Sequence, residues 1–233
     1  EHSALFQSLQ GCKDRGEVKR LILTCSGGPF FGKTRKELEW MTREDALQHP
    51  NWSMGAKITV DSATLMNKGL EFIEAMHLYQ MPPEKISIVV HRESIIHSQV
   101  EYCDNAMMAQ MGTPDMRLPI QYAFSFPERL PLKGERLDFF KTQKLEFFEP
   151  DVAKFPCLQL AYDAIHQGGN MPCVLNAANE VANAAFRKGQ CSFLGMADII
   201  SKTMSQVSFD ANPDLDVYLS TDREARKVAA SYL

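Results

Sequence analysis

The chain has 233 residues, of which 45% are hydrophobic and 23% are charged. That balance is typical of a folded globular protein with a substantial core, and it excludes a disordered chain. The 25 basic and 29 acidic residues give a net charge of −4, so no basic field is available and we expect no nucleic acid partner. Because residue 1 is Glu and not Met, we expect either that a segment was removed or that the chain is a piece of a longer one.

Neither a membrane span nor a disulfide framework is expected. The longest aliphatic runs, such as residues 21–23 and 88–90, are far shorter than the about 20 apolar residues that a spanning helix needs. No two of the six cysteines form a Cys-x-x-Cys pair, and most have apolar neighbours, which is typical of reduced thiols. These features predict a protein of a cytosol-like compartment.

Short apolar runs alternate with a helical pattern in residues 1–125. Strands are predicted at residues 21–24, 57–60 and 86–90, where β-branched residues are frequent. A helix is predicted from about residue 63 to residue 80, because two prolines that follow it cannot continue a helix. This alternation is typical of an α/β or α+β layer domain.

The pattern of residue types along the chain changes after residue 125. Prolines and a glycine break any regular period in residues 126–150, so we predict a linker with one strand at residues 144–148. In residues 151–233 the pattern is helical, and the last of four predicted helices begins at the capping-box pair Thr221 and Glu224. The predicted fold class is therefore α+β, with an α/β sheet domain followed by a small C-terminal four-helix bundle.

A glycine loop directly follows the first predicted strand. Residues 24–30 are Thr-Cys-Ser-Gly-Gly-Pro-Phe. Glycines let a backbone approach a ligand closely, and the Ser26 hydroxyl beside free amides suits a phosphate. No Gly-Lys-Ser/Thr follows, so this is not a Walker loop. A tight turn at the end of a strand explains the same residues, and both interpretations stay open.

The stretch 60–71 is predicted to run from a strand into a helix whose N-cap is Asp61 or Ser62. A helix N-terminus is a natural anion site. Spacings of three and four residues let an amide, an ammonium and a carboxylate converge on one side of this helix, which suits a phosphorylated substrate that also binds a divalent metal. These residues are Asn67, Lys68 and Glu71. A solvated ion pair beside an ordinary cap is the alternative.

Two further loops mix residue types that bind ligands. Residues 49–55, His-Pro-Asn-Trp-Ser-Met-Gly, have the composition of a mobile loop that closes on a ligand, or of a surface loop that Trp52 anchors. Residues 111–117, Met-Gly-Thr-Pro-Asp-Met-Arg, predict a helix-start turn or a functional loop. The Asn-Ala-Ala-Asn-Glu stretch at residues 176–180 is interpreted as polar packing within helices and not as a site.

Taken together, these motifs are far more specific than any one of them. The ordered set of residues 26–30, 49–55, 57–71, 111–117 and 175–180 resembles the 1-deoxy-D-xylulose 5-phosphate reductoisomerase family, and the resemblance covers essentially the whole chain. That family has an N-terminal NADPH domain, a central catalytic domain and a C-terminal helical bundle. No Gly-rich dinucleotide fingerprint occurs in the chain, so we expect the NADPH domain to be absent.

The resemblance implies a domain organisation and a substrate site. Residues 1–125 would be the catalytic substrate- and metal-binding domain, residues 126–150 a linker and residues 151–233 the bundle. The phosphate of the sugar substrate would be held by Ser26, His49, Ser62, Asn67 and Lys68. The catalytic residues would be His49, Lys68 and Glu71.

The resemblance also implies where the cofactors bind. Trp52 would cover the bound substrate, and Gly55, with Met54 beside it, would approach the nicotinamide of NADPH. Met116 would pack near the nicotinamide.

Glu1 and Glu71 are the metal ligands that the resemblance implies, and both would also contact the substrate. Glu1-His2 matches the end of the family's Asp-Ser-Glu-His motif, whose first two residues are missing here. The metal would be Mn²⁺, Mg²⁺ or Co²⁺. The chain departs from the family pattern at Cys25, where a small residue is expected, and at Arg92-Glu93, where Pro-Gln is expected.

The implied reaction is the NADPH- and metal-dependent conversion of 1-deoxy-D-xylulose 5-phosphate to 2-C-methyl-D-erythritol 4-phosphate in non-mevalonate isoprenoid biosynthesis. We expect this chain to be inactive alone, because the NADPH domain and one metal ligand are missing. The resemblance implies a homodimer without a membrane partner, either in the bacterial cytoplasm or in a plastid-type organelle. A non-catalytic sugar-phosphate-binding module and a purely structural dimerisation piece remain as alternatives.

Overall fold

The computed structural model describes all residues 1–233, and the chain forms two compact units. The first unit comprises Glu1–Ser26 and Ala75–Pro150, and the second comprises Gly27–Glu74 and Asp151–Leu233. The units therefore interleave along the chain, whereas the expected division into residues 1–125, 126–150 and 151–233 follows chain order and stays a prediction. None of the helices is both long and apolar enough to cross a membrane.

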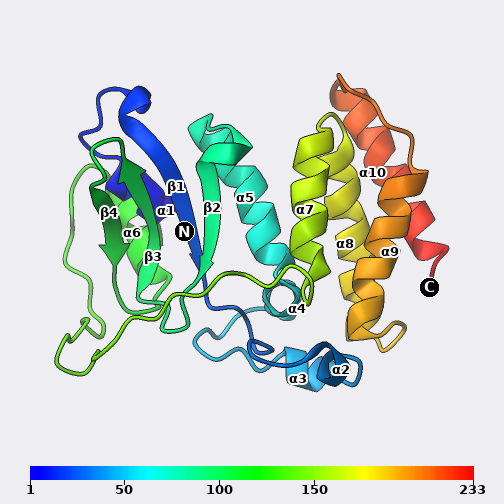
Figure 1. The fold of residues 1–233 in the computed structure, drawn as a ribbon, viewed down its shortest axis with the longest axis horizontal. Coiled ribbons are helices and arrows are strands. Elements are labelled where there is room, and N and C mark those ends of the chain that lie inside the picture. The colour runs from blue at the N-terminus through cyan, green and yellow to red at the C-terminus, as the bar shows by residue number, and fades with distance from the viewer. The chain divides into compact units, whose positions relative to one another are not determined.

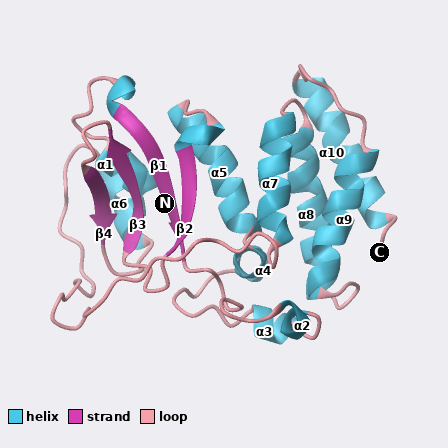
Figure 2. Ribbon diagram, viewed as in Figure 1, coloured by secondary structure: helices cyan, strands magenta, loops and turns pink.

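The first unit is built on a four-stranded mixed sheet (Figures 1 and 2). Its strands are β1 (Val18–Cys25), β2 (Ile86–Val90), β3 (Ile96–Tyr102) and β4 (Met107–Met111), in the order β2-β1-β3-β4. β1 pairs parallel with β2 and antiparallel with β3, and β4 pairs antiparallel with β3. The predicted strands at residues 21–24 and 86–90 are confirmed, and the α+β class is confirmed with them.

Short helices and a long irregular segment complete the first unit. The helices are α1 (His2–Ser8), η1 (Arg15–Glu17), η2 (Pro83–Lys85) and α6 (Arg117–Ser125). The strand predicted at residues 144–148 is reduced to a single bridge, in which Val90 and Phe148 exchange two backbone hydrogen bonds of 2.9 Å. The other residues of 126–150 form no helix or strand, and all of them belong to the first unit.

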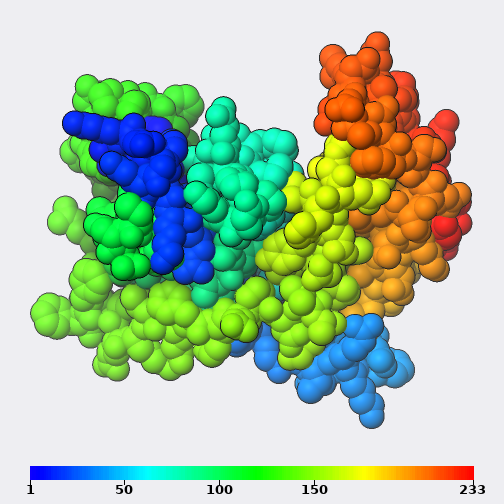
Figure 3. Space-filling model, turned by 45° about the horizontal axis from the view of Figure 1, so that its top comes forward, coloured from blue at the N-terminus to red at the C-terminus, as the bar shows by residue number.

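The second unit is helical. Its elements are α2 (Arg35–Leu38), α3 (Arg43–Ala46), α4 (Ala56–Thr64), the first turns of α5 (Met66–Tyr79), α7 (Pro156–Gln167), α8 (Met171–Arg187), α9 (Phe193–Gln206) and α10 (Leu215–Ala230). α8 packs against α7, α9 and α10, and the yellow, orange and red side chains of α8 to α10 lie in contact in Figure 3. The four helices predicted after residue 151 are thus all present.

Two predictions for this unit are wrong. Residues 57–60 are not a strand, because they lie in α4, where Thr59, Val60 and Ala63 turn a buried face toward the unit's interior. Tertiary packing here overrides the strand preference of β-branched residues. α10 begins at Leu215, and its N-cap Asp214 lies seven residues before the predicted cap at Thr221, which is buried inside the helix.

α5 and α7 approach each other closely at Gly69. A Cβ atom on Gly69 would lie 2.5 Å from the Cβ of Ala161, closer than two carbon atoms can pack. One turn further along α5, the Phe72 ring meets the Tyr162 ring edge-on with their centroids 5.0 Å apart. The absence of a side chain at position 69 therefore sets how close α5 lies to α7.

This contact predicts the effect of moving one methyl group. Gly69→Ala is expected to lower the free energy of unfolding by about 1–3 kcal/mol, because the added methyl overpacks the α5–α7 contact. The double variant Gly69→Ala with Ala161→Gly places the methyl on the opposite helix and is expected to recover most of that loss. Urea denaturation measures both. Equal midpoints for Gly69→Ala and the parent protein would contradict the close approach.

Candidate functional site

α4 and α5 meet at a sharp turn, where the predicted anion site lies. α4 ends at Thr64, Leu65 takes a left-handed conformation with φ 61°, and α5 starts at Met66. Ser62 therefore lies in the last turn of α4, and the predicted N-cap at Asp61 or Ser62 is wrong. The amides that carry the positive end of a helix dipole belong instead to the first turn of α5.

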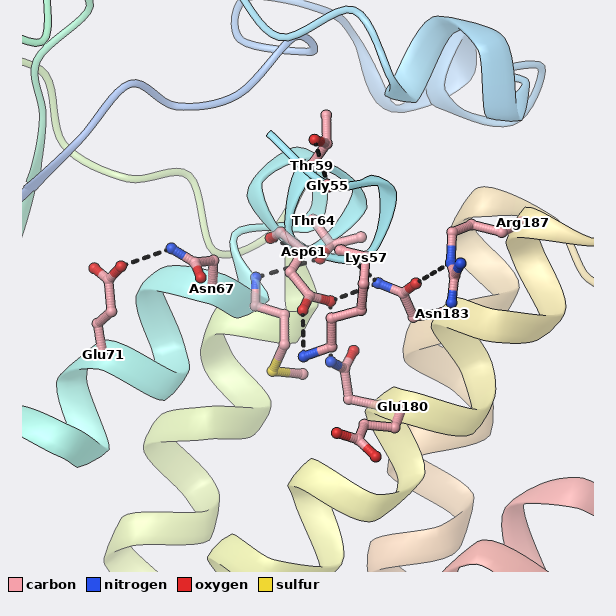
Figure 4. A network of polar contacts seen from close by, with 12 residues as sticks. Gly55, Lys57, Thr59, Asp61, Thr64, Asn67, Glu71, Glu180, Asn183 and Arg187 are labelled. Atoms are coloured by element: carbon pink, nitrogen blue, oxygen red, sulfur yellow. Dashed lines mark hydrogen bonds and ion pairs between the residues drawn. The ribbon is translucent and has the colours of Figure 1, made fainter. Parts of the chain in front are cut away.

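Asn67, Lys68 and Glu71 converge one turn into α5. Asn67 Nδ2 donates to Glu71 Oε1 at 2.7 Å, and the Lys68 ammonium donates to the other oxygen of the same carboxylate. Figure 4 shows Asn67 and Glu71 facing each other along the helix. Lys68 is only 4% exposed, which excludes the alternative of a solvated surface ion pair.

The glycine loop packs onto the end of α4. Gly27 and Gly28 both have positive φ angles, 76° and 68°. A Cβ atom on Gly28 would lie 2.6 Å from the carbonyl oxygen of Ser62, so only glycine fits at this position. Phe30 is 1% exposed and its ring meets that of Phe193 on α9 edge-on, with 4.8 Å between centroids. The second unit thus places the loop beside Ser62.

His49 organises the loop of residues 49–55. Its Nδ1 atom accepts hydrogen bonds from the backbone amides of Asn51 at 3.2 Å and Trp52 at 3.0 Å. In the neutral ring the proton therefore lies on Nε2, which is the tautomer that can donate to an anion. Gly55 ends the loop as the N-cap of α4, and a Cβ atom there would meet nothing within 4 Å.

In the first unit, two hydroxyl groups orient the carboxylate of Glu1. Its Oε2 atom accepts hydrogen bonds from Thr24 of β1 at 3.0 Å and from Ser98 of β3 at 2.6 Å. Ser98 has φ 110° at an irregularity in the pairing of β3. Sequence reasoning missed both hydroxyls, because a β-bulge that turns one side chain leaves no periodic signal.

Arg92 and Glu93, which depart from the family pattern, are both engaged within the first unit. Arg92 donates to the carbonyl oxygen of Ser26 at 2.6 Å, and burial lowers the pKa of its guanidinium. Glu93 lies 3.1 Å from Nδ1 of His91, whose ring is fully buried and stacks on Phe147. Arg92 thus holds the backbone at Ser26, and Glu93 holds the turn after β2.

The remaining candidates belong to different units. Met116 is the N-cap of α6 in the first unit and is 57% exposed. Met54 lies in the second unit, directly before Gly55. Glu1 belongs to the first unit and Glu71 to the second, and no group of three or more His, Cys, Asp or Glu residues could hold a metal ion. Each unit thus contains one of the two candidate metal ligands.

Sequence reasoning also missed a polar network beneath the α4–α5 turn. The Asp61 carboxylate is 1% exposed and is bonded by Asn179 of α8. Asn183 of α8 and Lys57 also bond it, as Figure 4 shows. The interpretation of residues 176–180 as packing was therefore incomplete. A usable signal exists, because Asn179 and Asn183 are four residues apart and so lie on one face of a helix.

Two family models match the chain. One, described as the DXP reductoisomerase C-terminal domain, matches residues 111–228, and the other, described as the 1-deoxy-D-xylulose 5-phosphate reductoisomerase C-terminal domain, matches residues 1–79. The chain is also similar in sequence to curated relatives named 1-deoxy-D-xylulose 5-phosphate reductoisomerase. That of Bacteroides fragilis is 54% identical over 98% of this chain and 59% of its own length, and that of Chlorobium chlorochromatii is 54% identical over 100% and 61%.

Solved structures agree with the sequence matches. The reductoisomerase of Zymomonas mobilis in complex with NADPH has a TM-score of 0.91 and 46% identity, over 99% of this chain and 59% of that one. A DOX-P reductoisomerase in complex with NADPH, fosmidomycin and magnesium has a TM-score of 0.92 and 38% identity, over 99% and 61%. The chain spans about 60% of the length of the curated relatives it matches. The chain belongs to the 1-deoxy-D-xylulose 5-phosphate reductoisomerase family.

Proposed function

We propose that this chain carries the substrate-phosphate and metal-binding residues of an NADPH-dependent reductoisomerase. The reaction converts 1-deoxy-D-xylulose 5-phosphate to 2-C-methyl-D-erythritol 4-phosphate. The substrate rearranges to an aldehyde by retro-aldol cleavage and re-addition, and the aldehyde is then reduced. Residues of both units take part in this proposal, and its support comes from the local geometry of each unit and from the family.

The buried Lys68 at the start of α5 is the observation that carries the proposal. An ammonium that is 4% exposed needs an anionic partner, and Glu71 supplies one here. The first-turn amides of α5, the Asn67 amide and this ammonium together have the donors that bind a phosphate. We propose that the substrate phosphate binds at this turn, with Ser62, Ser26 and the Nε2–H of His49 as further donors.

Glu1 and Glu71 suit a hard divalent cation. Mg²⁺ usually binds to proteins through one or two carboxylates and takes its remaining ligands from substrate oxygens and water. Two carboxylates from this chain therefore fit Mg²⁺ or Mn²⁺ together with a chelating substrate. When bound, the metal supplies Lewis-acid polarisation of a substrate carbonyl. Thr24 and Ser98 hold Glu1 in one orientation, and Asn67 does the same for Glu71.

The loop of residues 49–55 is proposed to cover the reacting part of the substrate. Trp52 is half-buried at a turn that His49 holds, and we propose that closure of this loop brings its ring over the substrate. Closure would exclude water from the aldehyde. Gly55 and Met54 follow directly and are proposed to contact the nicotinamide of NADPH, as is Met116.

The proposal predicts a selective effect at Lys68. We expect activity when this chain is joined to the preceding segment of the Bacteroides fragilis relative, and Lys68→Ala should lower its kcat/KM by about 100-fold or more, because the phosphate loses its buried cation. NADPH oxidation measures the rate. The control is Lys85→Ala, which removes an exposed lysine of η2 and should change the rate less than twofold.

Two outcomes would contradict this prediction. Full activity of Lys68→Ala would remove the phosphate site from α5. A joined protein that binds the sugar phosphate without oxidising NADPH would support a non-catalytic binding module instead.

A second prediction concerns Gly55. Gly55→Ala should leave the thermal midpoint unchanged, because the added Cβ meets nothing within 4 Å and the residue has an ordinary φ of −62°. The same methyl should raise the KM for NADPH about tenfold or more if the nicotinamide packs against this position. Steady-state kinetics at saturating sugar phosphate measure the effect, and an unchanged KM for NADPH would refute the contact.

A further inference from the structure

The Asp61 carboxylate is buried under the α4–α5 turn with a full set of donors. Its Oδ1 accepts from Asn179 Nδ2 at 3.0 Å and from Asn183 Nδ2 at 2.8 Å, and its Oδ2 pairs with the Lys57 ammonium at 2.8 Å. Asp61, Asn179 and Asn183 are each at most 2% exposed. A carboxylate out of water tolerates no missing partner, so α4 is held where α8 presents these amides.

The amide of Asn183 has a defined orientation. Its oxygen accepts from Arg187 Nε at 2.8 Å, so its NH₂ group must point the other way, toward Asp61. The same NH₂ group also donates to the backbone carbonyl of Lys57 at 2.9 Å (Figure 4). One side chain of α8 therefore bonds both the first turn of α4 and the carboxylate one turn later.

A chain of hydrogen bonds leads from Asp61 to the start of α5. The Thr64 hydroxyl donates to the Asp61 carbonyl at 3.1 Å and accepts from the Met66 amide at 3.3 Å. The Ser62 carbonyl accepts from the amide of Leu65 at 3.2 Å. Asn67 and Lys68 follow Met66 directly, so the position of Asp61 determines where the first turn of α5 begins.

The carboxylate of this network and the two amides of α8 are buried, whereas the Lys57 side chain is 41% exposed. The Cys157 thiol of α7 lies among the same residues. Its burial, and to a lesser extent the nearby negative charge of Asp61, raises the pKa of this thiol to about 12. Hydrogen bonds act with greater strength and stricter geometry where water is excluded. Neighbouring positions of α8, such as Ala178 and Ala182, are small and apolar, so packing alone does not call for two amides here.

We propose that Asn179 and Asn183 are positioning residues for the substrate phosphate. They hold Asp61, and through Thr64 they fix the turn that presents Asn67 and Lys68. This inference rests on the proposed role of those two residues in phosphate binding. It assigns to α8 of the C-terminal region a part in substrate affinity, although no side chain of α8 is proposed to touch the substrate.

The test compares three asparagines of one helix in the joined protein. Asn179→Ala and Asn183→Ala are expected to raise the KM for 1-deoxy-D-xylulose 5-phosphate about tenfold or more, because a shift of α5 misplaces the phosphate donors. The KM for NADPH should stay within twofold. Asn176→Ala, one turn earlier on α8 and outside the network, is the matched control and should leave both KM values unchanged.

A rescue experiment separates positioning from general stability. Asp61→Asn keeps an oxygen that accepts from both α8 amides, but it turns an NH₂ group toward the Lys57 ammonium, so the KM for the sugar phosphate should rise. Adding Lys57→Gln supplies an acceptor for that NH₂ group. The double variant should therefore return the KM to within about threefold of the parent value, whatever its thermal midpoint.

The outcomes are distinct. An unchanged KM for the sugar phosphate in both Asn179→Ala and Asn183→Ala would overturn the inference. It would also be overturned if these variants and Asp61→Asn impaired every kinetic parameter equally and adding Lys57→Gln to Asp61→Asn restored none of them. If either asparagine variant fails to fold, the Asp61 and Lys57 pair decides. If the parent joined protein has no turnover, the proposed function fails, and calorimetric titration with inorganic phosphate then tests positioning alone. Weaker phosphate binding by Asn179→Ala than by Asn176→Ala supports it, and equal binding refutes it.

Discussion

A buried carboxylate determines how the second unit is arranged. Asp61 is removed from water and satisfied by two amides of α8 and one lysine of its own helix. Because an unpaired charge in this position would be strongly unfavourable, α4 has one acceptable placement on α8. The left-handed turn at Leu65 and the first turn of α5 follow from that placement. The strongest candidate for an anion site therefore depends on a contact with one helix, α8, more than 100 residues further along the chain.

Two apolar contacts also attach residues 27–74 to the C-terminal helices. Phe30 packs the glycine loop against α9 through its edge-on contact with Phe193, and Gly69 allows α5 to pack closely against α7. The glycine loop, α4 and α5 are thus each attached to a different one of the C-terminal helices. This explains why Gly27–Glu74 forms a compact unit with Asp151–Leu233. In our proposal the C-terminal helices form a rigid support for the residues that bind the substrate phosphate.

The sequence correctly predicted those elements whose local residue pattern agrees with the structure that tertiary packing imposes on them. β1 and β2 are apolar runs with strand propensity, and both were found where they were expected. Residues 57–60 also have strand propensity, but Asp61 requires the donors of α8, and packing on α8 imposes a helix. β4 is Met-rich with no clear alternation, so no local signal marked it. β3 does alternate, with polar His97, Gln99 and Glu101 between more apolar positions, and sequence reasoning did not use that signal.

Within the site, spacing alone predicted that Asn67, Lys68 and Glu71 converge, because three- and four-residue separations place side chains on one face of a helix. It could not predict that Lys68 is buried, or that the amides of Asn179 and Asn183 face Asp61, because those contacts join segments far apart in the chain. Only the resemblance to the family suggested the roles that we propose for Glu1 and Gly55, because no local pattern indicates them.

The central claim is that the substrate phosphate binds at the first turn of α5. A crystal structure of the protein with fosmidomycin and magnesium tests it most directly, because the phosphonate of this ligand can stand in for the phosphate. We predict phosphonate oxygens within hydrogen-bonding distance of Lys68 Nζ and Asn67 Nδ2, with α4 still held by Asn179 and Asn183. A phosphonate bound elsewhere, with the Lys68 ammonium paired to Glu71 as it is without ligand, would contradict the account.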